Sequence, residues 1–357
     1  MNELEKFVKL SKYAGERFDL VQAGGGNSSV KLSDGSMIIK ASGFLLSEMD
    51  TSKGYSKVDN ARVISIMKNK ELLTIADKKE KDSYAKNLMD EAIIDSQNRP
   101  SIETFLHALL DTYTLHTHPL LVNIITAQAD WEDQLNKLFE NCLMIKYKTP
   151  GIELASELNS QLESYINAHN IKPKIVFLQN HGLIVSARDD EEVIALTEVV
   201  LDKIEQYLAI DQSRYKLTTK ISSLVNSLGQ SSKIAYLSDD RNLCSLLESN
   251  KKSFFSKPFC PDKLVYCGIS AVELQDISST GPLIEYKHDY FELPRVIIYK
   301  ENIFLIADTV KKAKEIEDVL KFHLLVMTSS KNNPICLEEK ELMYLGNWEA
   351  EKYRQTI

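Results

Sequence analysis

Three histidines offer the side-chain chemistry of a metal site. His116 and His118 stand two residues apart at the end of residues 113–118, where polar and apolar residues alternate and predict a strand. Alternate residues of a strand share a face, so both imidazoles can reach one ion. His181 follows a short apolar run and can supply a third ligand, leaving a fourth position open to a substrate. A lone histidine is more often a surface or core residue, so the prediction of a zinc-like divalent ion rests on all three.

Glu103 is the candidate for proton transfer beside these histidines. It lies at the start of a predicted helix with Ser101 as the expected N-cap. Its carboxylate can simply be stabilised by the positive end of the helix dipole. Alternatively, it can act as a general base whose pKa an apolar pocket raises. His107, one turn later, can orient Glu103 or a ligand, or only pack. The expected buried face of this helix consists of Ile102, Phe105, Leu106, Leu109 and Leu110.

A glycine loop offers a place for a small anion. Gly24–Gly26 presents successive backbone N–H groups without side chains, which suits a phosphate, although an ordinary turn is an equal alternative. Ser42, Gly43 and Ser101 add donors that can meet the same anion. Neither GxGxxG nor GxxxxGK[ST] is present, so the sequence gives no support to a bound NAD or ATP.

The elements that carry these residues predict a mixed fold. A helix over residues 2–20 leads into the glycines, and Asp34-Gly35 predicts a two-residue hairpin turn between strands 29–32 and 37–41. Short strands with helices between them favour an α/β protein of the α+β type, with three layers and a mostly antiparallel sheet. Further elements are expected as strands 175–178 and 183–186 and helices 152–169 and 190–211.

A second domain is expected after a stretch rich in Ser, Asn, Gly and Gln around residues 222–233. We therefore predict a metal-binding catalytic domain over 1–228 and a smaller α/β domain over 229–357. Strands at 296–299 and 303–306 and a helix at 309–326 belong to the smaller domain, for which the sequence suggests no role. No internal repeat is evident.

Composition narrows the class of protein. The 357 residues carry a net charge of -8, which argues against a nucleic-acid partner because a phosphate backbone requires a clustered basic surface. The first twenty residues are too charged for a signal peptide, and no run of 18 apolar residues occurs, so we expect a cytoplasmic protein without a membrane partner. Five scattered cysteines without a CxxC pair favour neither disulfides nor a cysteine zinc site.

Taken together and in order, these motifs resemble the class II aldolase/adducin family. The C-terminal part is similar to the aldolase half of bifunctional rhamnulose-1-phosphate aldolase/alcohol dehydrogenases, although residues 300–303 replace the glycines expected there. Ile102 also stands where fuculose-phosphate aldolases tend to have a small polar residue. The motifs that carry the resemblance are Gly26-Asn27-Ser28-Ser29, Ser42-Gly43, Pro100-Ser101-Ile102-Glu103 with His107, His116-Thr117-His118-Pro119, Asn180-His181-Gly182, Phe259-Cys260-Pro261-Asp262, Leu293-Pro294-Arg295-Val296 and the closing Leu337-Glu338-Glu339 to Trp348-Glu349.

The resemblance implies a function and a division of roles. It implies zinc on His116, His118 and His181, proton transfer by Glu103, and a homotetramer. The expected activity is that of a lyase: a metal-dependent aldolase that cleaves or forms a ketose 1-phosphate, giving dihydroxyacetone phosphate and an aldehyde through a metal-stabilised enediolate. Alternatives are a sugar-phosphate 4-epimerase or dehydratase on the same fold, an adducin-like interaction protein without activity, and, more remotely, a metallohydrolase. The implied phosphate ligands are Asn27, Ser28, Ser42, Gly43 and Ser101.

Overall fold

The computed structural model of the chain describes residues 1–95, 98–229, 232–332 and 334–346. It divides into two compact units, Met1–Gln212 and Ser213–Ile357. The division therefore precedes the boundary near residue 228 that the Ser- and Gly-rich stretch predicted, because this stretch begins inside helix α10 (Ser213–Asn226). Ile221 and Val225 of α10 are fully buried in the core of the second unit, which is why the helix belongs to that unit.

The first unit is built on one eight-stranded sheet with the strand order β4-β3-β2-β1-β5-β8-β7-β6. Neighbouring strands are antiparallel except β6 and β7, which run parallel and are connected by helix α8 (Ile152–His169). The strands are β1 (Asn27–Lys31), β2 (Ser36–Lys40), β3 (Tyr55–Asp59), β4 (Ile93–Asp95), β5 (Tyr113–Thr117), β6 (Leu143–Ile145), β7 (Ile175–Leu178) and β8 (Gly182–Ala187).

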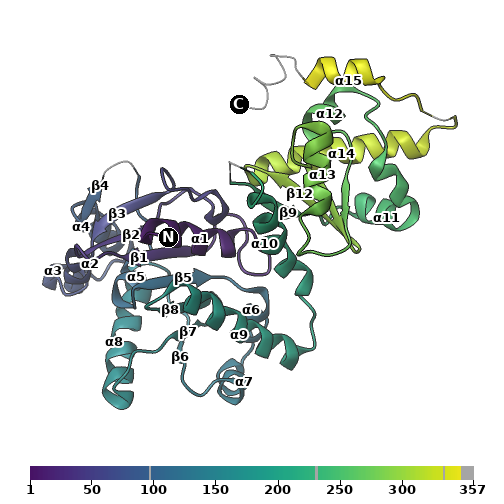
Figure 1. The fold of residues 1–357 in the computed structure, drawn as a ribbon. Helices are drawn as coiled ribbons and strands as arrows, with labels where there is room; N and C mark the ends of the chain where they lie inside the picture. Colours follow the sequence, from purple (N-terminus) through teal and green to yellow (C-terminus); the bar gives the residue numbers. More distant parts are fainter. Residues whose placement is uncertain (96–97, 230–231, 333, 347–357) are drawn as a thin grey trace. The chain divides into compact units, whose positions relative to one another are not determined.

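Helices cover both faces of this sheet, because its strands carry apolar side chains on both sides (Figure 1). Leu115 of β5 belongs to the core on one face, and Met37 and Ile39 of β2 belong to the core on the other. The predicted three-layer sandwich with a mostly antiparallel sheet is confirmed. The first layer holds α1 (Glu3–Gly15), α6 (Leu120–Thr126), α7 (Trp131–Leu138) and α9 (Asp190–Leu208); the second holds α2 (Asn60–Ile66), α3 (Lys70–Thr74), α4 (Lys78–Asp90), α5 (Thr104–Leu109) and α8.

Two local predictions near the site need correction. The loop between β1 and β2 is longer than a two-residue turn: the Leu32 amide donates to the Ser36 carbonyl at 2.8 Å, and Gly35 takes a φ of 84°. Glu103, and not Ser101, occupies the N-cap position of helix α5, and the hydroxyl oxygen of Ser101 accepts the Glu103 N–H at 3.3 Å just before the helix. Ile102 consequently precedes the helix and is 60% exposed, so it does not belong to the buried helical face.

The second unit is a smaller α/β domain, as predicted. Its four-stranded sheet has the order β10-β11-β12-β9, with one parallel pair, β10 and β11. Helices pack on both faces of this sheet. The elements are β9 (Ile234–Leu237), α11 (Arg241–Asn250), the 3₁₀ helix η2 (Lys251–Phe255), α12 (Pro261–Cys267), β10 (Val272–Leu274), α13 (Gly281–Tyr290), β11 (Val296–Tyr299), β12 (Asn302–Ala307), α14 (Val310–Ser329) and α15 (Glu339–Gly346).

This second sheet repeats the arrangement of the last four strands of the first. Across the first sheet these strands lie in the order β5-β8-β7-β6, and across the second sheet in the order β9-β12-β11-β10. In each sheet the first of the four strands in the chain is therefore followed by the fourth, the third and the second, with the same parallel and antiparallel pairs. The helices agree as well: α9 and α14 follow the last strand, and α8 and α13 connect the parallel pair. The fold therefore contains a structural repeat that the sequence did not reveal.

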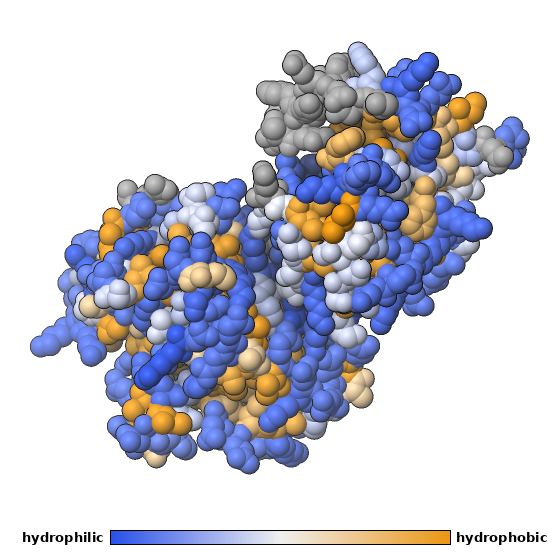
Figure 2. All heavy atoms as spheres, in the orientation of Figure 1, coloured by the Kyte–Doolittle hydropathy of each residue, from blue (hydrophilic) through white to orange (hydrophobic). Residues whose placement is uncertain are grey.

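Two features of the surface complete the description. None of the helices in the described part of the chain is long and apolar enough to cross a membrane. Hydrophilic side chains cover most of the visible face of the first unit, with hydrophobic ones in smaller groups (Figure 2).

Candidate functional site

The three histidines converge at the end of β5 and the start of β8. His116 is fully buried in β5, where it pairs in register with Asn27 of β1 and Ile184 of β8. His181 lies in the turn before β8, which is adjacent and antiparallel to β5, so this turn lies beside the end of β5. The ring centroids of the three histidines are 4.8 to 5.1 Å apart. One nitrogen of each ring lies within 4.8 Å of one nitrogen of each other ring.

Two glycines let the backbone approach this cluster. A Cβ at Gly182 would lie 2.2 Å from the Thr117 carbonyl oxygen, so only glycine allows β8 to begin against the end of β5. A Cβ at Gly25 would lie 2.7 Å from Nδ1 of His118, so the glycine loop rests directly on that ring. Steric exclusion therefore explains why glycine follows His181, and the contact of Gly25 with His118 makes the glycine loop part of the site.

Glu103 joins the cluster through two of the histidines. Its Oε2 lies 3.0 Å from His116 Nδ1, and its Oε1 lies 3.2 Å from His181 Nε2. The amide nitrogen of Asn27 donates to the same carboxylate, whose residue is only 6% exposed. Glu103 therefore links two of the three histidines within the site.

The charge state of Glu103 differs from the sequence expectation. Burial by itself raises the pKa of Glu103, but the imidazoles of His116 and His181 outweigh it and hold this pKa well below its ordinary value. The expected upward shift toward the working pH is therefore wrong in direction. Glu103 is therefore ionised at neutral pH, and its carboxylate can accept a proton.

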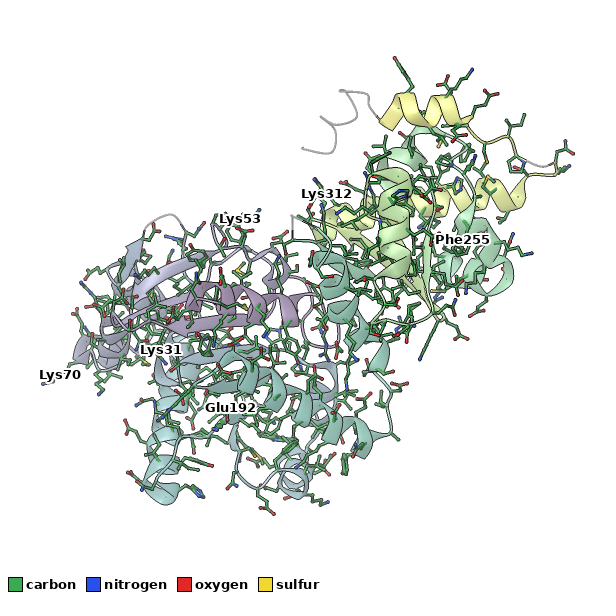
Figure 3. The ribbon with its side chains drawn as sticks, in the orientation of Figure 1. Lys31, Lys53, Lys70, Glu192, Phe255 and Lys312 are labelled. Atoms are coloured by element: carbon green, nitrogen blue, oxygen red, sulfur yellow. The ribbon has the colours of Figure 1, made fainter. Side chains whose placement is uncertain are left out.

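The His107 N–H donates to the Glu103 carbonyl at 3.4 Å, but its imidazole is hydrogen-bonded to Ser29 and not to the Glu103 carboxylate. His107 is fully buried, its Nδ1 lies 2.8 Å from the Ser29 hydroxyl, and burial followed by the nearby charge of His116 lowers its pKa to about 3. His107 is thus a neutral ring that ties α5 to β1. Lys31, labelled in Figure 3, reinforces this connection because its Nζ donates to the carbonyls of His107 and Asp111 at 3.0 Å.

The residues expected to bind phosphate fall into three groups. Asn27 points at Glu103, and its buried side-chain oxygen has no hydrogen-bond partner in the part of the chain that the structure describes. The hydroxyl of Ser28 faces α1, where it lies 2.7 Å from the Ser11 hydroxyl, so the structure does not bring this side chain to the site. Ser42 and Ser101 line one cavity of the first unit. Gly43 follows with a φ of 88°, a conformation that suits glycine.

Lys40 is a site residue that the sequence reasoning missed. It is 4% exposed at the end of β2, and its Nζ donates to the Gly24 carbonyl at 3.4 Å. Burial lowers its pKa, while the charges of Glu103 and Glu48 act in the opposite direction. The lysine directly before Ala41-Ser42-Gly43 was the available signal, but a single lysine in a strand gives no indication of its burial.

A buried ion pair, also not predicted, holds the loop that carries His118 in place. Arg17 and Asp19 are both almost fully buried and meet in a bidentate contact of 2.6 and 3.0 Å. The carbonyls of Asp19 and Leu20 accept the amides of Leu120 and His118, each at 2.9 Å. The segment before the glycine loop therefore positions one of the three histidines through its backbone.

The histidines fit a bound metal ion by their unsatisfied nitrogens. His116 Nε2, His118 Nε2 and His181 Nδ1 are buried and have no hydrogen-bond partner among the described residues. Buried polar atoms without partners are costly, and imidazole nitrogens suit zinc-like ions. In the second unit the matching positions hold no such set: Leu237 stands at the place of His116, and Glu301 precedes β12 as His181 precedes β8.

Comparison with known proteins places this architecture in a family. The model of the class II aldolase and adducin N-terminal domain matches residues 5–208, more than half of the chain. The chain belongs to the class II aldolase/adducin family.

Individual relatives are distant. The chain is 26% identical over 220 residues to YuxG of Bacillus subtilis (strain 168), described as an uncharacterized oxidoreductase; the match covers 57% of this chain and 29% of that protein. The chain thus spans less than a third of that relative's length. The solved N-terminal class II aldolase domain of a conserved Thermoplasma acidophilum protein matches with 24% identity and a TM-score of 0.49, covering 58% of this chain and 94% of that one. L-fuculose-1-phosphate aldolase from Thermus thermophilus matches with 14% identity and a TM-score of 0.37, covering 58% and 92%.

Proposed function

We propose that the protein is a metal-dependent lyase that cleaves or forms a ketose 1-phosphate, with dihydroxyacetone phosphate and an aldehyde as the other side of the reaction. The observation that carries this proposal is the carboxylate of Glu103 lying 3.0 and 3.2 Å from two members of a three-histidine cluster. Membership of the class II aldolase/adducin family supports it.

His116, His118 and His181 hold the divalent ion in this proposal. When bound, a divalent cation supplies Lewis-acid stabilisation of negative charge that develops on substrate oxygens. Zinc fits an all-imidazole set and leaves a position for substrate. The buried nitrogens of these histidines, which find no hydrogen-bond partner within the described residues, favour a resident ion over a purely structural cluster.

Glu103 moves the proton. Its buried carboxylate, 3.0 Å from His116 and 3.2 Å from His181, is placed to remove a proton from the carbon next to the carbonyl of dihydroxyacetone phosphate in the direction of bond formation. In the direction of cleavage it returns that proton. The amide of Asn27, by donating to the carboxylate, keeps it oriented toward the substrate.

The charge of Lys40 supports an anionic substrate. This ammonium is buried next to the glycine loop, and among the described residues no carboxylate oxygen lies within 4.0 Å of it. A buried cation without an ion pair is costly unless a ligand supplies the opposite charge. Together with Ser42, Gly43 and Ser101 it favours a phosphate on the substrate. The family resemblance adds a homo-oligomeric assembly to the proposal.

The decisive experiment is a panel of ketose 1-phosphates assayed for release of dihydroxyacetone phosphate. We expect release from at least one member, loss of that activity in Glu103→Gln, and retained metal in the variant. Glu132→Gln is the matched control, because Glu132 lies on α7 with Lys146 at 3.9 Å as its ion partner. Change of configuration at C4 without free dihydroxyacetone phosphate would assign the epimerase alternative instead, and full activity of Glu103→Gln would remove this residue from the mechanism.

A further inference from the structure

A cavity of about 400 Å³ opens where the candidate phosphate residues Ser42 and Ser101 lie. Its far wall is helix α4, which contributes Ala85, Lys86 and Met89. No motif in the sequence pointed to α4, so this wall is a feature that only the fold brings to the serines.

Arg99 is held beside both serines by backbone pairing. Ala41 and Pro100 form an antiparallel bridge, which places Ser42 opposite Arg99, and the Ser42 amide donates to the Arg99 carbonyl at 2.8 Å. Side chains of directly opposed residues start roughly 5 Å apart. Arg99 lines the same cavity as Ser42 and Ser101, so the three residues border one space.

The ion pair between Arg99 and Asp90 is loose. Asp90 lies 3.8 Å from Nη2 of Arg99, which is longer than a hydrogen bond, and the side chain of Arg99 is 63% exposed. Lys86 is the second cation of the cavity, and Asp82 and Asp90 are its carboxylates. A guanidinium that retains free N–H groups can bind phosphate through two parallel hydrogen bonds.

Ile102 explains why an additional donor is needed. Its side chain is 60% exposed, lines the cavity next to Ser101, and would be only 3.4 Å from a Cβ at Gly151. An aliphatic side chain offers no hydrogen bond to an anion, so the position beside Ser101 contributes none. Lys40 and the two serines remain as neighbouring donors, and a further donor has to come from elsewhere in the cavity.

We propose that Arg99 is a specificity residue that binds the phosphate group of the substrate together with Ser42 and Ser101, in the cavity walled by α4. This inference rests on the proposed function, since it assumes a phosphorylated substrate at the histidine cluster. Arg99 acts on binding and not on the chemical step, because it touches the phosphate and none of the reacting carbons.

The test compares Arg99→Gln with Arg62→Gln in the full chain. Arg62 is a matched control because it is also an exposed arginine with a carboxylate partner, Glu91 at 2.5 Å, on α2. Inorganic phosphate is the probe, measured by calorimetry, with malonate as a carboxylate of similar charge. We expect phosphate binding to weaken roughly tenfold in Arg99→Gln and to stay unchanged in Arg62→Gln. Ile102→Ser, which adds a hydroxyl at an exposed position, should strengthen phosphate binding.

The possible outcomes are separable. Equal phosphate affinity in wild type and Arg99→Gln would overturn the role of Arg99 while leaving the proposed function standing. Malonate binding as tight as phosphate, with the same loss in Arg99→Gln, would replace the phosphate by a carboxylate and overturn the stated specificity. Absence of phosphate binding in the wild type would overturn this inference together with the phosphorylated substrate. With an active ketose 1-phosphate, Arg99→Gln should raise KM roughly tenfold and leave kcat within about twofold.

Discussion

Replacing Gly25 by alanine tests whether the glycine loop positions His118. A Cβ at this residue would lie 2.7 Å from His118 Nδ1 and 3.0 Å from the Gln22 carbonyl oxygen. Ordinary contact begins at 3.4 Å, so the imidazole would have to move by about 0.7 Å, the difference between 3.4 and 2.7 Å. A metal–nitrogen bond tolerates deviations of only about 0.2 Å, so this displacement removes His118 from good coordination geometry.

The expected result is weaker metal binding in a folded protein. We expect Gly25→Ala to lower the affinity for zinc roughly 10- to 100-fold, the effect typical of disturbing the support of a metal ligand. The φ of Gly25 is not positive, so alanine itself is not strained there, and the unfolding free energy should change by less than about 1 kcal/mol. Chelator competition measures the affinity, and the absorption spectrum of the cobalt-loaded protein reports the geometry.

Gly24→Ala is the control for this experiment. A Cβ at Gly24 meets nothing within 4 Å, so the neighbouring substitution adds the same methyl group without touching His118. We expect its zinc affinity and cobalt spectrum to match those of the wild type. Equal affinity in Gly25→Ala and Gly24→Ala would refute the conclusion that close packing of the loop on His118 governs the metal site.

Three further predictions concern stability. Asp19→Asn should cost about 1.5 to 3 kcal/mol in urea denaturation, because it removes the bidentate carboxylate of the buried Arg17 and leaves Glu198 as its ion partner. Removing metal with a chelator should lower the unfolding temperature of the first unit and leave that of the second unit unchanged. Zinc at 100 times its Kd adds about 2.7 kcal/mol to the unfolding free energy of a unit that binds it, and nothing to one that does not. Burial and the charge of Lys263 lower the pKa of His323 to about 4 from 6.5, so its contribution to stability is complete above pH 6.5 and is lost as the pH falls toward 4. This amounts to roughly 3 kcal/mol, and His323→Asn should flatten the pH dependence of unfolding of the second unit between pH 6.5 and 4.5.

The strands and helices with strong patterns could be predicted closely from the sequence. The strand Ile175–Leu178 and the helix Ile152–His169 agree residue for residue with the prediction, because an uninterrupted apolar run and an amphipathic period are local signals. Residues 44–99 were different. They contain α2, α3 and α4, whose helices are short or strongly charged and bury few side chains each, so no clear period marks them.

The residues of the site also differ in how far the sequence could predict them. The proximity of His116 and His118 could be predicted from their spacing, although β5 ends at Thr117 and His118 lies in the loop after the strand. Lys40 and Arg99 could not be found, because burial of a lysine and pairing of residue 99 with residue 42 depend on segments distant in the chain. The direction of the Glu103 pKa was also misjudged, since it depends on two histidines reaching the same carboxylate.

The sequence by itself determined the residue types of the metal site, their order and the family to which they point, because short motifs encode local geometry and chemistry. Only the tertiary structure decided that Ser28 faces α1, that Glu103 contacts two of the histidines, and that a cavity walled by α4 lies beside Ser42. It alone revealed that the second unit repeats the topology of the last four strands of the first. The physical reason is that strand pairing and packing join segments far apart in the chain, and such contacts leave no spacing pattern that one sequence can display.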